Sequence, residues 1–257
     1  MTVLPRGFPK SRGIEERFSR ASRTIKVLPY TNHLRDGRSA DGQIEHRNNT
    51  RSCANRSYGT HASRREGLAF IRYITHPQVR IDFDRPVTAW GLSDVGRTRA
   101  ARLLEQPWVS AIGRVITSDE NKAIETARLL AARLGIEAEV RSRVGENDRS
   151  ATGPLPAAEF ERLADQFFAR PHERIRGWES AIEAQLRIVT ELADLLNAAQ
   201  SFDLAVIGHG GVGTLWYCHL AGLPIDRRYD QPSQGHYFSI DLSTGRPAHA
   251  WRPIDKL

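Results

Sequence analysis

The chain has 257 residues and is basic overall, with 37 Lys and Arg against 30 Asp and Glu. No apolar run approaches the roughly 18 residues that a membrane-spanning helix needs, and the two cysteines, Cys53 and Cys218, show no zinc or disulfide-framework spacing. These features argue against a membrane protein and a disulfide-rich secreted domain, and they favour a reducing, cytoplasmic setting.

The basic charge is concentrated in residues 1–66, which carry fourteen Lys and Arg against six Asp and Glu. This segment is rich in Arg, Ser, Asn, Thr and Gly and shows neither strand nor helix periodicity. Such a composition cannot bury enough apolar surface to offset the entropy of ordering, so we predict a disordered tail. An organellar transit peptide, a nucleic-acid-binding arm, and sequence upstream of a true start near Leu68 are further interpretations.

Residues 67–257 are close to neutral, which gives no indication of a nucleic-acid-binding face. Strand-like and helix-like stretches alternate along them. Such alternation predicts a single α/β domain with a mostly parallel sheet and helices on both faces. In chain order we expect a strand at 69–75, a helix at 92–106 with Ser93 as N-cap, a strand at 113–118, a helix at 119–135 ending at Gly135, a strand at 136–141, a polar loop at 142–156, helices at 157–169 and 178–199, a strand at 202–208, a helix at 211–222, and a closing antiparallel pair around the turn STGR.

Two of these strands end in a histidine. The run AFIRYIT ends at Thr75 and is followed by His76 and Pro77, and the run FDLAVIG leads to His209 in a Gly-His-Gly-Gly turn. Ligands of parallel sheets gather at the carboxyl ends of the strands, so we expect the two imidazoles to lie close together. The helix that follows His209 would present backbone N–H groups, beginning near Gly210, to an anion.

Acidic and basic side chains from two further segments are expected at the same edge. Lys122 lies in the first turns of the helix after the strand 113–118, and the polar loop contains Glu146, Asp148 and Arg149. Two imidazoles, an acid and several cations suit phosphoryl transfer: a neutral His attacks phosphorus, cations neutralise the oxygens, and an acid protonates the leaving alkoxide. This chemistry needs no metal or other cofactor, and the sequence contains no H-E-x-x-H, Walker A or EF-hand pattern.

Four blocks spread over residues 68–252 resemble the histidine phosphatase (phosphoglycerate-mutase-like) superfamily. They are, in order, the strand ending at His76, LSDVGRTRA, TSDENKAIETA and VIGHGGV. The resemblance implies a phosphoglycerate-mutase-like fold, His76 as phosphohistidine nucleophile and His209 as a phosphate-binding partner. It also favours Glu146 over Asp148 as the proton donor.

The chain departs from the family pattern at the phosphate-binding arginines. The family's first block usually reads Arg-His-Gly, whereas this chain reads Thr75-His76-Pro77, and Lys122 stands where the second block has Arg. Lysine keeps the charge but cannot donate two parallel hydrogen bonds. Arg149 is the preferred replacement, Thr75 offers a hydroxyl, and the other candidate arginines are Arg72, Arg80 and Arg143.

The sequence therefore predicts a metal-independent phosphomonoester hydrolase that forms a phosphohistidine and acts on a small phosphorylated substrate. A mutase is less favoured, because residues 67–257 leave little room for the insertions of the sugar-phosphate mutases that the chain resembles. The alternative is a phosphate-binding or scaffold protein of the same fold that lost turnover with its arginine. The run GHGGVG at 208–213 also fits a dinucleotide-binding pattern, but too little chain follows it for such a domain.

Overall fold

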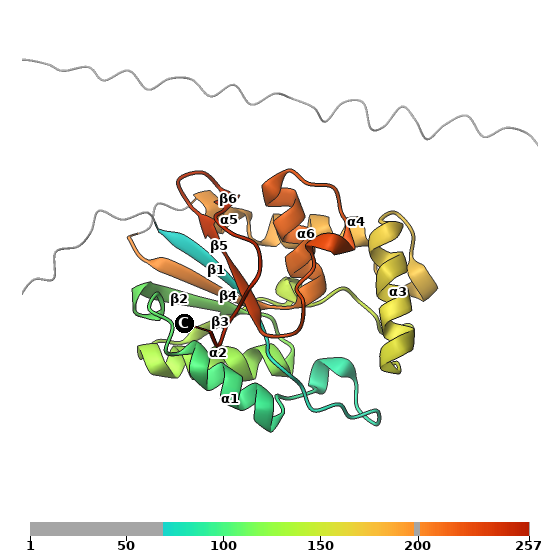
Figure 1. Cartoon of the computed structure of the whole chain (residues 1–257), viewed down its shortest axis with the longest axis horizontal. Helices are drawn as coiled ribbons and strands as arrows, with labels where there is room; N and C mark the ends of the chain where they lie inside the picture. The colour runs from blue at the N-terminus through green and yellow to red at the C-terminus, as the bar shows by residue number, and fades with distance from the viewer. Residues whose placement is uncertain (1–68, 198–200, 257) are drawn as a thin grey trace, which may run out of the picture. The chain divides into compact units, whose positions relative to one another are not determined.

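The structure, a computed structural model, describes residues 69–197 and 201–256. The prediction of a disordered tail over 1–66 lies outside the described residues. Within them, no helix is both long enough and apolar enough to cross a membrane. The described residues form an α/β domain in which a central sheet carries helices on both faces (Figure 1). This architecture confirms the predicted fold class.

A seven-stranded sheet has the order β3-β2-β4-β1-β5-β6, and β7 pairs with β5. The neighbours β3, β2, β4 and β1 run parallel, as predicted, whereas β5 pairs antiparallel with β1, β6 and β7. The parallel strands place their carboxyl ends at one edge, where the two histidines follow. The strands are β1 (Phe70–Thr75), β2 (Ile112–Thr117), β3 (Ala138–Val140), β4 (Asp203–Gly208), β5 (His236–Asp241), β6 (Arg246–Pro247) and β7 (Arg252–Pro253).

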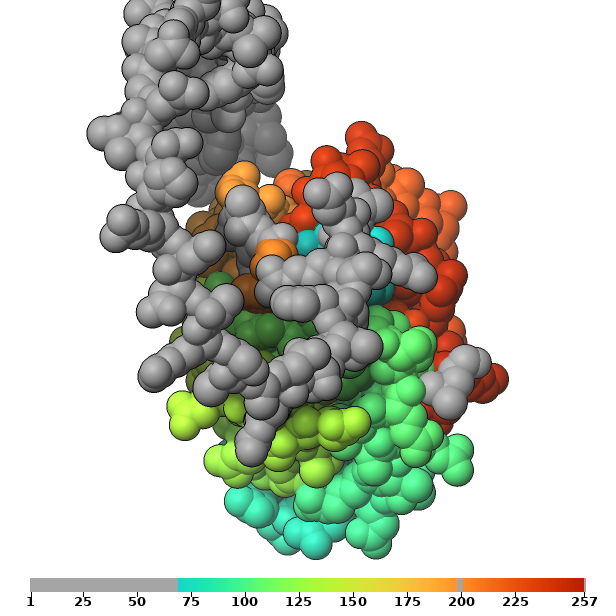
Figure 2. All heavy atoms as spheres, turned by 90° about the vertical axis from the view of Figure 1, so that its left-hand side faces the viewer, coloured from blue at the N-terminus to red at the C-terminus, as the bar shows by residue number. Residues whose placement is uncertain are grey.

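Two helix layers bury the two faces of the sheet. One apolar cluster joins the sheet to α1 and α2, and a second joins it to α4, α5 and α6. In the side view, the green atoms of α1 and α2 lie below and the orange and red C-terminal segments lie above (Figure 2). The helices are α1 (Asp94–Leu103), α2 (Asn121–Leu134), α3 (Ala157–Ala169), α4 (Ala181–Glu191), α5 (Ala193–Asn197) and α6 (Gly210–Ala221), and the 3₁₀ turns are η2 (Val87–Ala89), η3 (Val109–Ala111), η4 (Ser142–Val144), η5 (Ile175–Gly177) and η6 (Arg227–Tyr229).

The helix predicted over 178–199 differs most from the observed elements. It begins three residues later, because Ser180 accepts a hydrogen bond from the Glu183 N–H and the Glu183 side chain returns one to the Ser180 N–H. This capping box fixes the start of α4. The helix then breaks at Leu192, so that α4 and α5 are separate.

Tyr73 joins β1, β4 and α6 directly below the site. Its hydroxyl donates to the carbonyl of His209 and accepts from the N–H of the same residue, both at 3.1 Å. A Cβ at Gly208 or at Gly213 would lie only 2.3 Å from a Tyr73 atom. Gly208 and Gly213 of the GHGGVG run therefore allow close packing against a tyrosine, which explains these two glycines without a dinucleotide.

Candidate active site

The paired strands β1 and β4 bring His76 and His209 side by side. Thr75 and Gly208 are register partners at the ends of these strands, and the His76 N–H continues the ladder by donating to the Gly208 carbonyl at 3.2 Å. The two ring centroids lie 5.2 Å apart, with 65° between the ring planes. Both side chains are buried. The predicted meeting of the two imidazoles is therefore present in the fold.

The His76 ring is held as a neutral imidazole with one free nitrogen. Its Nδ1 lies 2.9 Å from the Pro77 carbonyl oxygen, and because a carbonyl only accepts, Nδ1 carries the hydrogen. Nε2 then keeps its lone pair, and no described residue hydrogen-bonds to it. Burial, helped by the charge of Lys122, lowers the pKa of His76 to about 4. The ring is therefore uncharged at neutral pH.

His209 lies in a deeper and more polar setting. Its Nε2 is 2.7 Å from the Ser118 hydroxyl and 3.3 Å from a carboxylate oxygen of Glu120. Its Nδ1 is buried and has no hydrogen-bond partner among the described residues. Burial outweighs the opposing effect of the Glu120 charge and lowers the pKa of His209 to about 3. Both rings of the pair are thus neutral.

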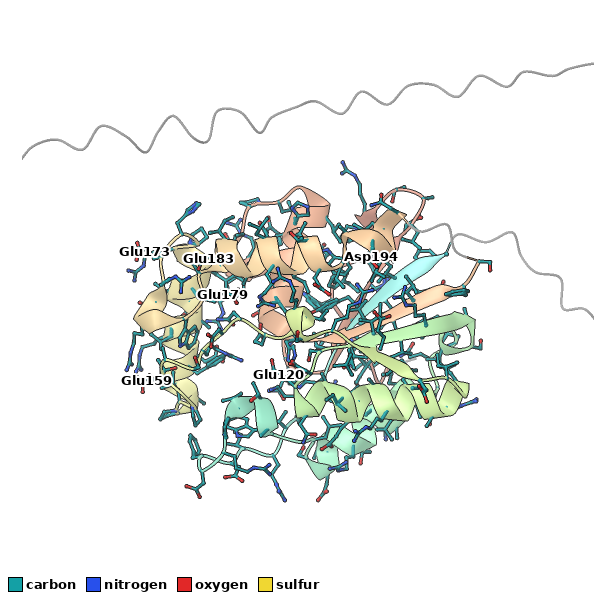
Figure 3. The ribbon with its side chains drawn as sticks, turned by 180° about the vertical axis from the view of Figure 1, so that it is seen from behind. Glu120, Glu159, Glu173, Glu179, Glu183 and Asp194 are labelled. Carbon is teal, nitrogen blue, oxygen red and sulfur yellow. The ribbon has the colours of Figure 1, made fainter. Side chains whose placement is uncertain are left out.

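Glu120 and Lys122, next to the histidine pair, form a buried ion pair at the start of α2. Figure 3 labels Glu120. The Lys122 ammonium also donates to the Val87 carbonyl at 2.9 Å. Burial opposes ionisation of Glu120, but the charge and hydrogen bond of the Lys122 ammonium hold the pKa of its carboxyl below the usual range. The positive charge predicted for phosphate binding is therefore already compensated by a carboxylate within the protein.

Glu146 occupies the N-terminus of α6. Its carboxylate accepts hydrogen bonds from the N–H groups of Gly211 at 3.0 Å, Val212 at 2.9 Å and Asn147 at 3.1 Å. Arg187 of α4 fixes the loop by donating to the Glu146 carbonyl at 3.1 Å. The helix N-terminus was expected to attract an anion beside His209, and the anion found there is the carboxylate of Glu146 itself.

Asp148, the other candidate acid, points elsewhere. Its carboxylate accepts from the Ser150 N–H at 2.9 Å, and its own N–H donates to Glu179 at 3.1 Å. It does not line the cavity that contains His76, whereas Glu146 does. Of the two acids that the sequence left open, only Glu146 is placed beside the histidines.

The Thr75 hydroxyl is already committed to protein groups. It accepts from the His236 N–H at 3.0 Å and donates to Oε1 of Gln231 at 2.6 Å. The Gln231 amide nitrogen then lies over Gly210, where an added Cβ would come within 2.3 Å of it. No described residue accepts from this nitrogen. Thr75 thus orients an amide donor next to the first residue of α6.

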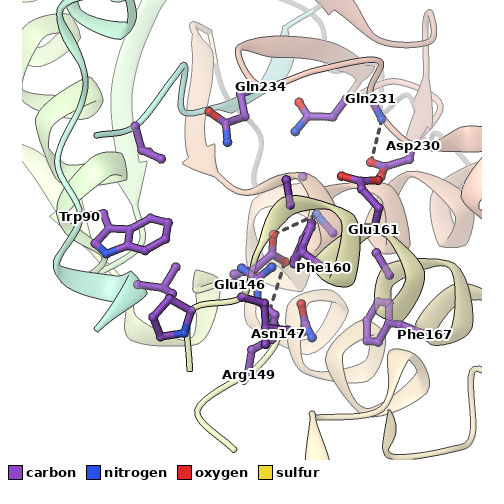
Figure 4. A pocket seen from close by; sticks show the side chains of 18 of the residues that line it. Trp90, Glu146, Asn147, Arg149, Phe160, Glu161, Phe167, Asp230, Gln231 and Gln234 are labelled. Carbon is purple, nitrogen blue, oxygen red and sulfur yellow. Dashed lines mark hydrogen bonds between the residues drawn. The ribbon is translucent and has the colours of Figure 1, made fainter. Parts of the chain in front are cut away.

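A cavity of about 460 Å³ opens in front of these groups (Figure 4). Its lining includes His76, Lys122, Glu146, Gly210 and Gln231. Arg149 also lines it, with its guanidinium 5.1 Å from the centroid of Phe160 and 5.7 Å from that of Trp178. Within residues 69–197 and 201–256, no group of three or more His, Cys, Asp or Glu side chains is arranged to hold a metal ion.

The family model of the histidine phosphatase superfamily (branch 1) matches residues 84–250. The chain belongs to this superfamily. The match begins after the strand that carries His76, which agrees with the departure of Thr75-His76-Pro77 from the family pattern. The comparison with curated protein sequences gave no match.

Several solved structures share the fold at low sequence identity. A native mycobacterial glucosyl-3-phosphoglycerate phosphatase has 20% identity and a TM-score of 0.60, and 72% of this chain and 99% of that chain are covered. Its complex with inorganic phosphate has 19% identity and a TM-score of 0.62, and the match covers 74% of this chain and 100% of that chain. YhfR of Bacillus stearothermophilus has 18% identity and a TM-score of 0.59, and the match covers 71% of this chain and 95% of that chain. At these identities the comparison establishes the fold of the domain.

Arg72, one of the predicted phosphate-binding residues, lies away from the histidine pair. Its guanidinium pairs with Asp203 at 2.8 Å and donates to the Ser239 hydroxyl at 2.6 Å. Asp203 begins β4, at the edge of the sheet opposite to the histidines. Of the other candidates, Arg143 pairs with Glu191 and Arg80 does not line the cavity. Arg149 is the predicted arginine that the structure brings to the cavity.

Replacing Arg72 by Met is expected to lower the free energy of unfolding by about 3 kcal/mol, because the buried carboxylate of Asp203 loses its partner. The KM for an aryl phosphate should stay within twofold of wild type. Urea denaturation and steady-state kinetics test the two statements. A rise in KM with unchanged stability would place Arg72 in phosphate binding instead.

Glu120 and Gln231 are among the site residues that the sequence analysis missed. Glu120 lies in the TSDENK junction, and an acidic residue just before a helix is too common to indicate a functional site. The packing of α2 brings its carboxylate to His209. Gln231 lies 156 residues from Thr75, so their hydrogen bond has no local signal. The position of Thr75, where the family has arginine, was the one indication that another donor should be sought.

Proposed function

We propose that this histidine phosphatase is a phosphomonoester hydrolase that works through a phosphohistidine on His76. The observation that carries the proposal is the free Nε2 of a buried, neutral imidazole that lines the cavity beside a second neutral imidazole. A phosphatase of the same fold has been solved with inorganic phosphate, which supports phosphate as the ligand class. No step requires a metal ion.

In the first step, His76 Nε2 attacks phosphorus, the new N–P bond forms and the bond to the ester oxygen breaks. Glu146, carrying a proton taken from solvent, gives that proton to the leaving alkoxide. Glu146 then accepts a proton from water as the water oxygen attacks phosphorus. The N–P bond breaks, its electron pair returns to His76, and inorganic phosphate leaves.

The phosphoryl oxygens would be held by groups from several segments. Arg149 supplies the positive charge, and the N–H of Gly210 and the Gln231 amide supply neutral donors. Lys122 stays close enough to lower the pKa of His76, although Glu120 compensates its charge. In this proposal the Thr75–Gln231 pair replaces part of the missing guanidinium, and Thr75 acts through Gln231.

A second candidate function is phosphate binding without turnover. The Glu120–Lys122 ion pair and the Glu146 carboxylate at the α6 N-terminus favour it, because both reduce the positive charge available to a transferred phosphoryl group. Arg149 is then the cation of the lining without an ion pair to a described residue. Hydrolysis of 4-nitrophenyl phosphate by the full chain in the presence of a chelator separates the two functions. Metal-free turnover supports the hydrolase, and phosphate binding without turnover supports the binding protein.

The activity should persist at pH values where an ordinary histidine is protonated. The pKa of His76 is lowered from 6.5 to about 4, so Nε2 keeps its lone pair above that pH. We expect kcat/KM, corrected for ionisation of the substrate, to change less than about twofold between about pH 7 and 5.5, because this interval lies above the lowered pKa of His76. A fall with an apparent pKa near 6.5 would contradict this assignment.

The same shifts make stability depend on pH. The unfolded chain takes up protons on His76 and His209 near pH 6.5, whereas the folded protein takes them up only near pH 4 and 3. The unfolded state therefore binds more protons between these values, and the free energy of unfolding decreases as the pH falls below 6.5. Urea denaturation at several pH values measures this decrease.

A further inference from the structure

We infer, resting on the proposed function, that the substrate is a phosphomonoester whose organic group is apolar and carries no second anionic group. Two independent observations support this substrate class. One is the apolar character of the cavity walls beyond the histidines, and the other is the balance of charges in the lining, where Arg149 is the cation without an ion pair to a described residue.

Two apolar walls face each other across the cavity. Val79, Val87 and Trp90 come from the segment between β1 and α1, and Leu155 and Phe160 come from the loop before α3 and from its first turn. Figure 4 shows Trp90 and Phe160 on different sides of the cavity. All five side chains are only half-buried, so each keeps apolar surface open to the cavity. An apolar ligand group would remove that surface from water.

Leu155 and Phe160 pack against the edge of the neighbouring hydrophobic core but stay half-buried, whereas Val79, Val87 and Trp90 belong to none of the core clusters of the described residues. Phe167, Phe168 and Trp178 also border the cavity, but they are 2–3% exposed and pack with α4 and α6. Their presence is explained by the core alone. The Trp90 ring, by contrast, is fixed by a 2.7 Å hydrogen bond from Nε1 to the Asp82 carbonyl and keeps part of its surface exposed. The segment carrying Trp90 is tied to the domain by the bridge between Val79 and Leu92.

The cationic side chains of the lining can neutralise one anionic group of a ligand. Of its cations, Lys122 is paired with Glu120, and Arg227 is paired with Glu161 and Asp165. Arg149 has no ion pair to a described residue. The lining also contains three acids, Glu146, Glu161 and Asp230. A second phosphate or a carboxylate on the substrate would meet these acids without a free cation, and burying an unpaired charge is costly.

The size of the cavity fits a small organic molecule. Its volume of about 460 Å³ lies within the range of roughly 300–1,000 Å³ found for small-ligand sites. Arg149 stacks on Phe160, so the free charge adjoins the apolar wall. A phosphoryl group at His76 and an apolar group between Trp90 and Phe160 would therefore both find matching surfaces.

Binding of non-hydrolysable phosphonates to the full chain, measured by calorimetry, tests the substrate class without relying on turnover. We expect hexylphosphonate and benzylphosphonate to bind at least about 10-fold more tightly than ethylphosphonate, since each buried methylene adds up to about fourfold. Affinity for 3-phosphonopropanoate, which adds a carboxylate, should be no higher than for ethylphosphonate. Equal affinities throughout, or tighter binding of the carboxylate, would overturn the inference.

Hydrolysis of the matching esters distinguishes failure of the inference from failure of the proposed function. Ethyl, hexyl and benzyl phosphate and glycerol 3-phosphate all release a primary alkoxide, so the organic group is the main difference between them. Chain-dependent phosphonate binding without ester hydrolysis would leave the inference standing and refute the proposed function. Hydrolysis with equal or higher kcat/KM for glycerol 3-phosphate than for hexyl phosphate would refute the inference alone.

A matched pair of variants locates the apolar wall. Leu155 lines the cavity, whereas Leu186 is 68% exposed on α4 and does not. Leu155→Asn should weaken hexylphosphonate binding at least fivefold and change ethylphosphonate binding less than twofold. Leu186→Asn should change neither. Equal effects of Leu155→Asn on the two phosphonates would show that the organic group binds elsewhere and overturn the assignment.

Discussion

Replacing His76 by Ala is expected to lower kcat for 4-nitrophenyl phosphate by roughly 10⁴-fold or more, as the loss of a nucleophile does in other covalent enzymes. The reason is that His76 Nε2 is the unbonded nitrogen that faces the cavity, and nothing else in the lining offers a comparable neutral nucleophile. Steady-state kinetics on the purified full chain measures the change. The free energy of unfolding should change far less than the activity.

The matched control is His219→Ala, because His219 is exposed on α6 and does not line the cavity. This variant should keep kcat within twofold of wild type. If His76→Ala retained a tenth or more of the wild-type activity while His219→Ala was unaffected, His76 would not be the nucleophile. The reaction would then need a different residue or a direct attack by water.

Replacing Lys122 by Met should lower the free energy of unfolding by about 3–5 kcal/mol, because the buried Glu120 carboxylate would lose its cation. Lys122 is 3% exposed, so water cannot take the place of the ammonium group. Urea denaturation followed by tryptophan fluorescence measures the loss. The exposed Lys256 provides a matched control, and Lys256→Met should cost less than about 0.5 kcal/mol.

The double variant Glu120→Gln with Lys122→Met tests the cause of that loss. Removing the carboxylate together with the ammonium leaves no unpaired charge, so the double variant should be more stable than Lys122→Met alone. A single variant that lost less than 1 kcal/mol, or a double variant that was less stable than the single one, would contradict a buried ion pair between these residues.

The sheet and the meeting of the histidines were predictable because they depend on local patterns. Apolar runs ending at Thr75 and Gly208 define strands, and the rule for parallel strands then places His76 and His209 together. The helix caps at Ser93 and Gly135 were equally local. Each of these features rests on a few adjacent residues and on one general rule of sheet geometry.

The partners of the charged residues were not predictable in the same way. Arg72 lies four residues before His76 in an extended strand, which separates the two by about 13 Å along the chain and puts Arg72 near Asp203 instead. Lys122 is predicted to contact phosphate, and no local pattern indicates that Glu120, two residues earlier, is its partner. Only tertiary packing shows that the two are buried together.

The role of Glu146 shows a third limit. The sequence indicates an acid in the polar loop and a helix N-terminus that attracts an anion, but no local pattern connects the two. The structure joins them, because the Glu146 carboxylate accepts the N–H groups of Gly211 and Val212. The long-range path of the loop, fixed by Arg187, determines this contact.

Detection of a phosphoryl group on His76 tests the central claim most directly. The full chain would be mixed with 4-nitrophenyl phosphate, quenched rapidly in alkali, which preserves phosphohistidine, and digested for mass spectrometry. The account predicts one acid-labile phosphoryl group on the peptide that contains His76, and none on that peptide in His76→Ala. Turnover without any phosphorylated histidine, or a phosphoryl group on His209 instead, would contradict it.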